Sequence, residues 1–351
     1  MDSCVYYKEG VAFSVHIDDI LMCGESTRVR AAVARIQQLF QTPCVRVGKE
    51  VVKFLGRDLS QQDDGTFVFG VGADYVRASL TSLGLEDLQP VLRMPKWNGQ
   101  DPNELPALCA VRQSWFRSAV GRLAWLDRPD VRSATIRLSA RLGRATAVCE
   151  QNLRQVWQYL AGTANRRSAI RPTLSDKDFV QCPVGSIAIH ADADWAGDSA
   201  DRRSLSGSAA WLRLRNGWVP LAVTCRKQST VSLSSGESEI AAVVDGAVLG
   251  LGFLNLAQEL LRGVGETTGE QPRLVLCNDS SCAISVIRRR GAGRRTRHLM
   301  VKVFYLQGLA RMEHVTVLKA GTSLMFADMA TKVGNWGANH FAALGLIDES
   351  D

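Results

Sequence analysis

The sequence predicts a mixed α/β carboxyl-terminal domain that follows a small α+β unit and a helical region. The 351-residue length allows two domains, because domains commonly run about 100–200 residues. With 46% hydrophobic and 22% charged residues, the composition is that of a folded globular protein. The strongest observation is the order of apolar patterns after residue 185, which reads βββαβααβα.

The first 72 residues are expected to form the α+β unit. The predicted elements are strands at 12–17 and 20–23, a helix near 28–40, and a second hairpin from strands at 51–59 and 66–71. Asp18 and Asp19 stand between the first two strands, at the tip of the first hairpin. Taken alone, this pair could be an ordinary acidic turn.

Residues 73–162 carry helical periodicity that is interrupted by a loop rich in Pro and Asn at 95–106. Helices are expected near 114–126, 129–142 and 150–160, with Pro129 suited to the first turn of the second. A polar segment, 163–184, then predicts a linker to the carboxyl-terminal domain. That domain is expected at 185–333, with a tail at 334–351.

The domain at 185–333 begins with three predicted strands. The expected elements are strands at 186–192, 206–214 and 218–225, a long helix behind residue 234, a strand at 274–277, helices at 280–287 and 298–309, a strand at 315–318, and a terminal helix starting within 325–331. Asn216-Gly217 is a strong hairpin signal, and Ser234 with Glu237 resembles a capping box. These elements predict a mixed five-stranded sheet with helices.

Four acids fall at the ends or beginnings of these elements: Asp192, Glu239, Asp279 and Asp328. Strand ends in a mixed α/β sheet gather ligands at one edge. Hydrolysis of a phosphodiester by two metal ions needs several converging oxygen ligands, and Mg²⁺ prefers carboxylates. A single acid could be a surface residue or a cap, since the chain has 35 acids, so the set carries the prediction. The pattern alone leaves Asp194 open as a substitute for Asp192.

The chain has a net charge of +7, and much of the positive charge is local. Six arginines without a balancing acid lie between residues 287 and 302: Arg288, Arg289, Arg290, Arg294, Arg295 and Arg297. Such a cluster favours contact with the nucleic-acid backbone, although a solvated basic loop would have the same composition.

The nine cysteines are scattered without a C-x-x-C pair, which predicts free thiols in a reducing compartment. No charged and then apolar leader opens the chain, and no uninterrupted apolar run approaches about 18 residues. We therefore expect an intracellular protein, cytoplasmic or nuclear, without a membrane partner. The oligomeric state stays open.

Several ordered motifs resemble one family, the Pol polyprotein of Ty1/copia-type retrotransposons. The motifs are HADADWAGD at 190–198, DRRSLSG at 201–207, RKQSTVSLSS at 226–235, ESE at 237–239, NDS at 278–280, RTRH at 295–298 and ADMATK at 327–332. Upstream, HIDDIL at 16–21, FLG at 54–56, SAVGRL at 118–123 and RPD at 128–130 resemble the polymerase part of the same family. The resemblance covers almost the whole chain.

For residues 185–333 the resemblance implies a ribonuclease H that cuts the RNA strand of RNA–DNA hybrids. Its catalytic and metal-binding acids would be Asp192, Glu239, Asp279 and Asp328, with two Mg²⁺ ions, or Mn²⁺, as cofactors. His298 would assist near the scissile phosphate or would be structural. A virus-like particle would be the location if the element is active.

For residues 1–162 the resemblance implies a truncated reverse-transcriptase palm at 1–72 and a thumb or connection region at 73–162. Asp18 and Asp19 would be a relic of the polymerase site. His16 replaces the usual Tyr before them, and the third carboxylate of a palm would lie upstream, so we expect no polymerisation by this chain alone. Two alternatives stay open: a catalytically silent nucleic-acid-binding fragment, or part of a polymerase that a missing upstream segment completes.

Overall fold

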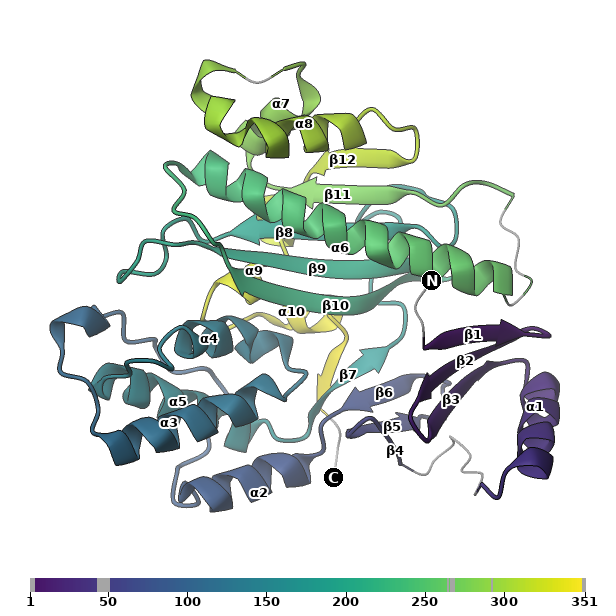
Figure 1. Cartoon of the computed structure of the whole chain (residues 1–351), viewed down its shortest axis with the longest axis horizontal. Helices are drawn as coiled ribbons and strands as arrows, with labels where there is room; N and C mark the ends of the chain where they lie inside the picture. Colours follow the sequence, from purple (N-terminus) through teal and green to yellow (C-terminus); the bar gives the residue numbers. More distant parts are fainter. Residues whose placement is uncertain (1–3, 43–50, 264, 266–268, 292, 349–351) are drawn as a thin grey trace.

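The computed structural model describes residues 4–42, 51–263, 265, 269–291 and 293–348 (Figure 1). Cys44 lies outside these residues, and the side chain of Arg295 is not described. The described strands form three sheets: β1-β2-β3, β10-β9-β8-β11-β12 and β13-β7-β6-β5-β4.

The central sheet lies in the carboxyl-terminal half and confirms the predicted order. Its strands are β8 (Ile187–Ala193), β9 (Leu205–Leu214), β10 (Gly217–Lys227), β11 (Leu274–Asn278) and β12 (Val315–Lys319). Strands β8, β9 and β10 pair antiparallel, whereas β11 pairs parallel with both β8 and β12. This mixed five-stranded sheet, with helices between its last strands, is a ribonuclease H-like fold.

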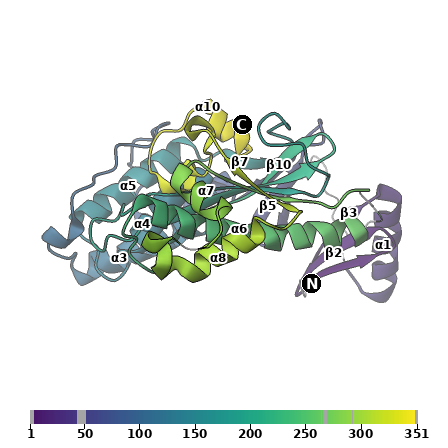
Figure 2. The same ribbon diagram turned by 90° about the horizontal axis from the view of Figure 1, so that it is seen from above.

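Helices cover both faces of this sheet. They are α6 (Ser235–Gly263), α7 (Ser281–Arg288), α8 (Met300–Leu309), α9 (Asp328–Thr331) and α10 (Ala338–Ala343). Figure 2 shows α6, α7 and α8 on one side and α10 on the other. Strand alternation explains the two layers, since Ile187 and Ile189 pack under α6, whereas Ala188 packs with Trp211 and Phe326 on the opposite face.

One helix of this half begins later than expected, whereas the terminal helix begins within the predicted range. A 3₁₀ turn, η2 (Arg294–Leu299), occupies the start of the helix predicted at 298–309. A second 3₁₀ turn, η3 (Thr322–Leu324), precedes the terminal helix, which opens at Asp328. Boundaries commonly differ by this much, because the terminal turns of helices are often 3₁₀.

The helical region is built from α2 (Ala73–Leu83), α3 (Ala110–Ala124), α4 (Pro129–Ser139) and α5 (Ala147–Gly162), with a short 3₁₀ turn, η1 (Pro102–Glu104), in the loop before α3. The three helices predicted for this region are present. Phe116, Leu153 and Trp157 are fully buried in its core. This core is separate from those of the central sheet.

The strand predicted at 51–59 is wrong as a single element. It is two strands, β4 (Val52–Phe54) and β5 (Arg57–Gln61), which pair antiparallel. Leu55 (φ 50°) and Gly56 (φ 73°) both adopt the left-handed conformation between them. A two-residue turn with two positive φ angles makes a tight hairpin, and Leu at the first position hides that signal.

The third sheet collects strands from distant parts of the chain. Strand β6 (Phe67–Gly70) pairs with β5 on one side and with β7 (Arg166–Ile170) on the other. Strand β13 (Leu346–Asp348) pairs with β7. The segment 163–184, predicted as a linker, and the tail 334–351 therefore both contribute strands to the sheet that holds β4–β6, while the domain boundaries themselves stay predictions.

At the amino-terminal side, β1 (Val5–Lys8), β2 (Val11–His16) and β3 (Asp19–Gly24) form a small sheet with α1 (Ser26–Leu39) beside it (Figure 1). The predicted hairpin is β2–β3, and β1 is an addition to it. Tyr7 lies against Gly263 at the end of α6, because a Cβ at Gly263 would fall 2.4 Å from the Tyr7 ring.

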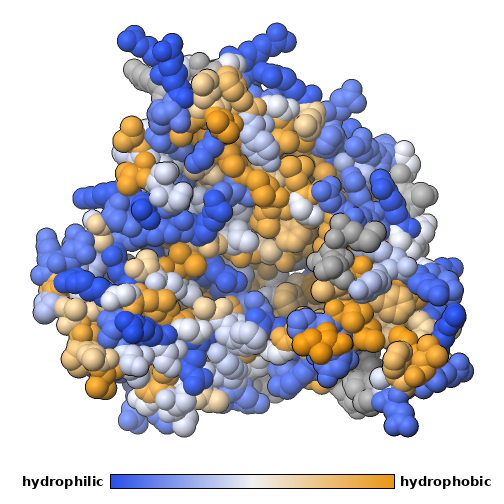
Figure 3. Space-filling view, viewed as in Figure 1, coloured by the Kyte–Doolittle hydropathy of each residue, from blue (hydrophilic) through white to orange (hydrophobic). Residues whose placement is uncertain are grey.

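Helix α6 is 29 residues long and apolar enough, by length and composition, to cross a membrane. Half of its most apolar window is buried, as in the core helix of a folded domain, so this is weak support for a span. Apolar side chains are visible on the face of the molecule that α6 and α8 cover (Figure 3). The exposed apolar residues of these two helices include Val248, Val301 and Phe304.

Candidate functional site

Three of the four predicted acids meet at one edge of the central sheet. Asp192 lies at the end of β8, Asp279 follows β11, and Glu239 projects from the first turns of α6. Cys277 pairs with His190 in the parallel register, so the two strand ends coincide and bring both aspartates to the same edge. One carboxylate oxygen from each acid lies within 4.8 Å of the others. Asp192 and Glu239 are buried, while Asp279 is half-buried.

Burial and mutual repulsion make these carboxylates hard to ionise together. Burial raises the pKa of Asp192 to about 6, and repulsion from Asp328 and Asp279 acts in the same direction. Burial, followed by repulsion from Asp192, raises the pKa of Glu239 to about 8. A divalent cation would relieve this repulsion, because it favours the ionised form of each carboxylate. The donor set therefore fits a hard cation that takes oxygen ligands.

Two neighbouring polar side chains hold the acids, and the sequence reasoning missed both. The Asn278 amide donates to Glu239 Oε2 and to the Ala191 carbonyl, each at 2.8 Å. The Thr331 hydroxyl donates to Asp192 Oδ2. Asn278 and Thr331 belong to the quoted NDS and ADMATK motifs, so the signal was present, but their partners lie 39 and 139 positions away.

Asp328 is near the cluster but is held differently. It is half-buried at the start of α9, and its carboxylate lies 2.7 Å from Lys332 Nζ. It acts on Asp192 through charge, raising the pKa of that carboxyl. The geometry of the described residues thus groups three acids and places the fourth beside them, paired with a lysine.

The alternative acid, Asp194, does not reach the cluster of three. Its carboxylate forms an ion pair with Arg137 of helix α4, and only 8% of its side chain is exposed. Asp192 lies near the end of β8 and Asp194 directly follows this strand, but only Asp192 lies with Glu239 and Asp279.

His298 lies in η2 and contacts the other acid of the ESE motif. Its Nε2 is 3.2 Å from the Glu237 carboxylate, and about half of the side chain is exposed. Glu237 also accepts a hydrogen bond of 2.8 Å from the backbone of Leu233. This arrangement ties η2 to the start of α6, and the catalytic role expected for His298 stays a prediction.

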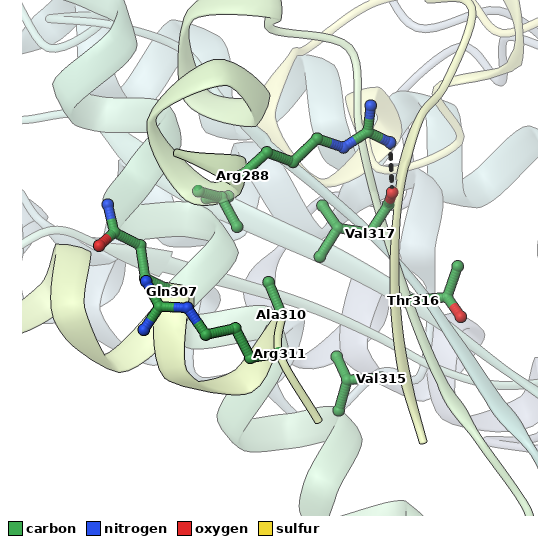
Figure 4. Close-up of a pocket in the computed structure, with 8 residues that line it drawn as sticks. Arg288, Gln307, Ala310, Arg311, Val315, Thr316 and Val317 are labelled. Atoms are coloured by element: carbon green, nitrogen blue, oxygen red, sulfur yellow. Dashed lines mark hydrogen bonds between the residues drawn. The ribbon is translucent and has the colours of Figure 1, made fainter. Parts of the chain in front are cut away.

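The arginine cluster surrounds the end of α7. Arg288, Arg289, Arg290, Arg294 and Arg297 are exposed. Figure 4 shows Arg288 reaching across a cavity of about 280 Å³ to the carbonyl of Val317 in β12, at 2.7 Å. Arg289 donates to the Thr296 hydroxyl at 3.1 Å. Arg288 and Arg289 are thus partly engaged within the protein, whereas Arg290, Arg294 and Arg297 face solvent.

Asp18 and Asp19 are exposed at the β2–β3 hairpin. Their sheet contacts the carboxyl-terminal end of α6, whereas Glu239 lies in its first turns. At 1.5 Å per residue, the helix from Glu239 to Gly263 spans about 36 Å. Among the described residues, Asp18 and Asp19 have no third metal-ligating side chain close enough to form a group like that of Asp192.

By its topology and its acidic cluster, the carboxyl-terminal half is a ribonuclease H-like domain. Comparison of the whole chain with known proteins extends this. The chain is 25% identical over 344 residues to the retrovirus-related Pol polyprotein from transposon RE1 of Arabidopsis thaliana, and the match covers 93% of this chain and 21% of the relative. It is 24% identical over 351 residues to the corresponding polyprotein from transposon TNT 1-94 of Nicotiana tabacum, covering 95% of this chain and 24% of that relative.

The homologues of this chain are therefore retrovirus-related Pol polyproteins of copia-type transposons from Arabidopsis and tobacco. The chain spans about a fifth to a quarter of the length of these curated relatives. It is also 33% identical over 131 residues to the secreted RxLR effector protein 161 of Plasmopara viticola, covering 36% of this chain and 83% of that protein. No protein-family model matches the chain.

Among solved structures, a foamy viral protease-reverse transcriptase in complex with double-stranded DNA is similar with a TM-score of 0.47 at 12% identity, over 88% of this chain and 46% of that one. The amino-terminal RNase H domain of Rv2228c from Mycobacterium tuberculosis is similar with a TM-score of 0.27 at 13% identity, over 42% of this chain and 90% of that one.

Proposed function

We propose that the domain at 185–333 is a ribonuclease H that hydrolyses the RNA strand of RNA–DNA hybrids with divalent metal ions. The observation that carries the proposal is the approach of Asp192, Glu239 and Asp279 to within 4.8 Å at the edge of a ribonuclease H-like sheet. Homology to Pol polyproteins supports a nucleic-acid substrate.

Asp192, Glu239 and Asp279 would hold Mg²⁺ or Mn²⁺, with Asp328 contributing from the start of α9. When bound, the ions would activate water for in-line attack and stabilise the departing oxygen. Asn278 donates to one oxygen of Glu239 and thereby orients this carboxylate toward the cluster. Because the protonated forms of Asp192 and Glu239 bind no metal, loading would release protons.

The exposed arginines around α7 would contact the phosphates of the hybrid. Arg289, Arg290, Arg294 and Arg297 are the residues we propose for this role, and Arg288 would contribute less because it already donates to Val317. DNA synthesis is outside the proposal, since among the described residues Asp18 and Asp19 form no group with a third metal-ligating side chain.

The test is a cleavage assay on a hybrid with a labelled RNA strand, in Mg²⁺. We expect cutting by the wild type and a loss of at least about a hundredfold in Asp192→Asn and Asp279→Asn, since removal of a group that stabilises the transition state commonly has such an effect. Asp74→Asn is the matched control, because this acid has a 98% exposed side chain in the helical region.

A folded wild-type chain that binds hybrid in a salt-sensitive manner and never cuts would overturn the nuclease. It would support the alternative of a nucleic-acid-binding fragment without catalysis. Equal activity in wild type and Asp192→Asn would also contradict the proposal, because it would indicate a contaminating nuclease.

A further inference from the structure

Helix α4 of the helical region meets the ribonuclease H-like domain beside the acidic cluster. Arg137, near the end of this helix, carries the contact. Its Nη1 donates to the carbonyl of Gly197 at 3.0 Å, and its Nη2 donates to the carbonyl of Thr331 at 3.1 Å. The same guanidinium forms an ion pair with Asp194. Only 19% of the Arg137 side chain is exposed, so water competes little for these bonds.

The partners of Arg137 lie on both sides of Asp192. Asp194 and Gly197 belong to the segment that leaves β8 just after Asp192. Thr331, at the end of α9, donates its hydroxyl to Asp192 Oδ2. The guanidinium therefore joins the strand that carries this acid to the helix that fixes its side chain.

Helix α9 is in tight contact with the strands beside Asp192. Gly207 of β9 pairs directly with Asp192. A Cβ at Gly207 would lie 2.7 Å from the Thr331 methyl carbon and 2.8 Å from Ala330. A small displacement of α9 would therefore move the Thr331 hydroxyl away from the carboxylate.

We propose that Arg137 is a positioning residue for the metal site: from helix α4 it fixes the start of the segment after β8 and the end of α9, and thereby the Asp192 carboxylate. This inference rests on the proposed metal site. Through Arg137, the helical region would support the metal site of the ribonuclease H-like domain, although the two are separate segments of the sequence.

A neighbouring contact supplies a matched control. Arg141, four residues further along the chain, forms an ion pair with Asp198, which also bonds Lys227. Arg141 therefore ties the same two parts of the molecule together, but its ion pair includes neither Asp194 nor Thr331. Loss of Arg141 should weaken only the contact between α4 and the ribonuclease H-like domain. Loss of Arg137 should weaken this contact and also remove the hydrogen bonds that position Asp192.

The experiment measures Mn²⁺ binding to the whole chain by calorimetry, together with hybrid cleavage over a range of Mg²⁺ concentrations. We expect Arg137→Ala to weaken Mn²⁺ affinity by about tenfold, the lower end of the effect of losing a partner that orients a metal ligand. The Mg²⁺ concentration for half-maximal cleavage should rise similarly, with a smaller change in the rate at saturating Mg²⁺. Arg141→Ala should stay within about twofold of the wild type in Mn²⁺ affinity.

Further variants keep the test decisive if Arg137→Ala does not fold, as judged by circular dichroism and melting. Thr331→Val removes the hydroxyl at nearly constant volume and should weaken Mn²⁺ binding, whereas Thr331→Ser should bind like the wild type. Arg137→Lys keeps the charge but loses the planar fork that reaches three acceptors, so it should restore only part of the affinity.

Unchanged Mn²⁺ affinity in Arg137→Ala, or equal losses in Arg137→Ala and Arg141→Ala, would overturn the inference. If the wild type cuts hybrid and the Arg137→Ala variant shows the same dependence of cleavage on Mg²⁺, the positioning role of Arg137 is overturned and the nuclease is upheld. A wild type that binds Mn²⁺ in an Arg137-dependent manner but never cuts would overturn the nuclease and uphold the positioning role.

Discussion

Replacing Glu239 by glutamine should make the metal-free protein more stable at neutral and alkaline pH. The folded state raises the pKa of this carboxyl from 4.5 to about 8, through burial and repulsion by Asp192. Between these two values the folded protein keeps a proton that the unfolded chain releases. Stability therefore falls as the pH rises, and the contribution of Glu239 is fully present only below about pH 4.5.

The size of the effect follows from the two pKa values. At about 1.4 kcal/mol for each pH unit, ionisation linked to Glu239 should lower the free energy of unfolding by roughly 3–4 kcal/mol between pH 5 and pH 8. A glutamine cannot ionise and can still accept the amide of Asn278, so Glu239→Gln should remove most of this slope.

Urea unfolding in the presence of a chelator, at pH 5, 6, 7 and 8, measures the slope. Addition of Mg²⁺ at pH 8 should stabilise the wild type by mass action and have little effect on Glu239→Gln. Glu86→Gln, at an exposed position, is the control and should keep the wild-type slope. A wild-type stability that is flat over this range, or a variant as steep as the wild type, would refute the reasoning.

Three further predictions concern the surroundings of the site. Gly207→Ala should lower the free energy of unfolding by about 1–3 kcal/mol and weaken Mn²⁺ binding, because the added Cβ would displace α9. Thermal melting and a calorimetric titration measure the two effects. Unchanged Mn²⁺ binding would contradict the prediction. Arg128→Ala should lower the free energy of unfolding by about 3–5 kcal/mol in urea, since the buried Asp130 would lose the two hydrogen bonds of 2.7 and 2.9 Å from this guanidinium and keep only its weaker contacts. Restored stability in the double variant with Asp130→Asn would confirm the cause. Removing three exposed arginines should reduce the slope of log affinity for hybrid against log salt by about 2–3, and an unchanged slope would exclude their contact with phosphates. These three are Arg289, Arg290 and Arg294.

The central sheet could be predicted because its signals are local. Asn216-Gly217 fixes the hairpin of β9 and β10, and the alternation in β8 marks two buried faces. The predicted capping contact between Ser234 and Glu237 is also present, since the backbone N–H of Glu237 donates to the Ser234 hydroxyl at 3.3 Å. Each signal operates within a few residues and agrees with the tertiary fold.

Strands β7 and β13 could not be predicted in the same way. Arg166–Ile170 and Leu346–Asp348 are short and contain few apolar residues. They are strands because of their pairing partners, and β7 finds β6 about a hundred positions earlier in the chain. Pairing over such separations leaves no pattern within either segment.

The acids of the site were predictable, but their supporting residues were not. Asp192, Glu239 and Asp279 fall at the boundaries of elements whose order is visible in the sequence. Arg137 and Thr331 matter only through contacts between segments 57 to 194 positions apart. A sequence pattern identifies chemical groups at element ends, whereas the hydrogen bonds that orient them depend on how separate cores meet.

The sheet that ends in β13 has a consequence for how the chain folds. Its strands come from residues 52–70, 166–170 and 346–348. Closing loops of this length is slow, because much chain entropy is lost before the pairing stabilises the product. During synthesis β7 cannot gain its second neighbour until residue 348 has left the ribosome. The core of the helical region can form early, whereas this sheet is complete only after the last strand has been made. Removal of residues 346–348 should therefore leave β7 as an open edge strand that can pair with other chains.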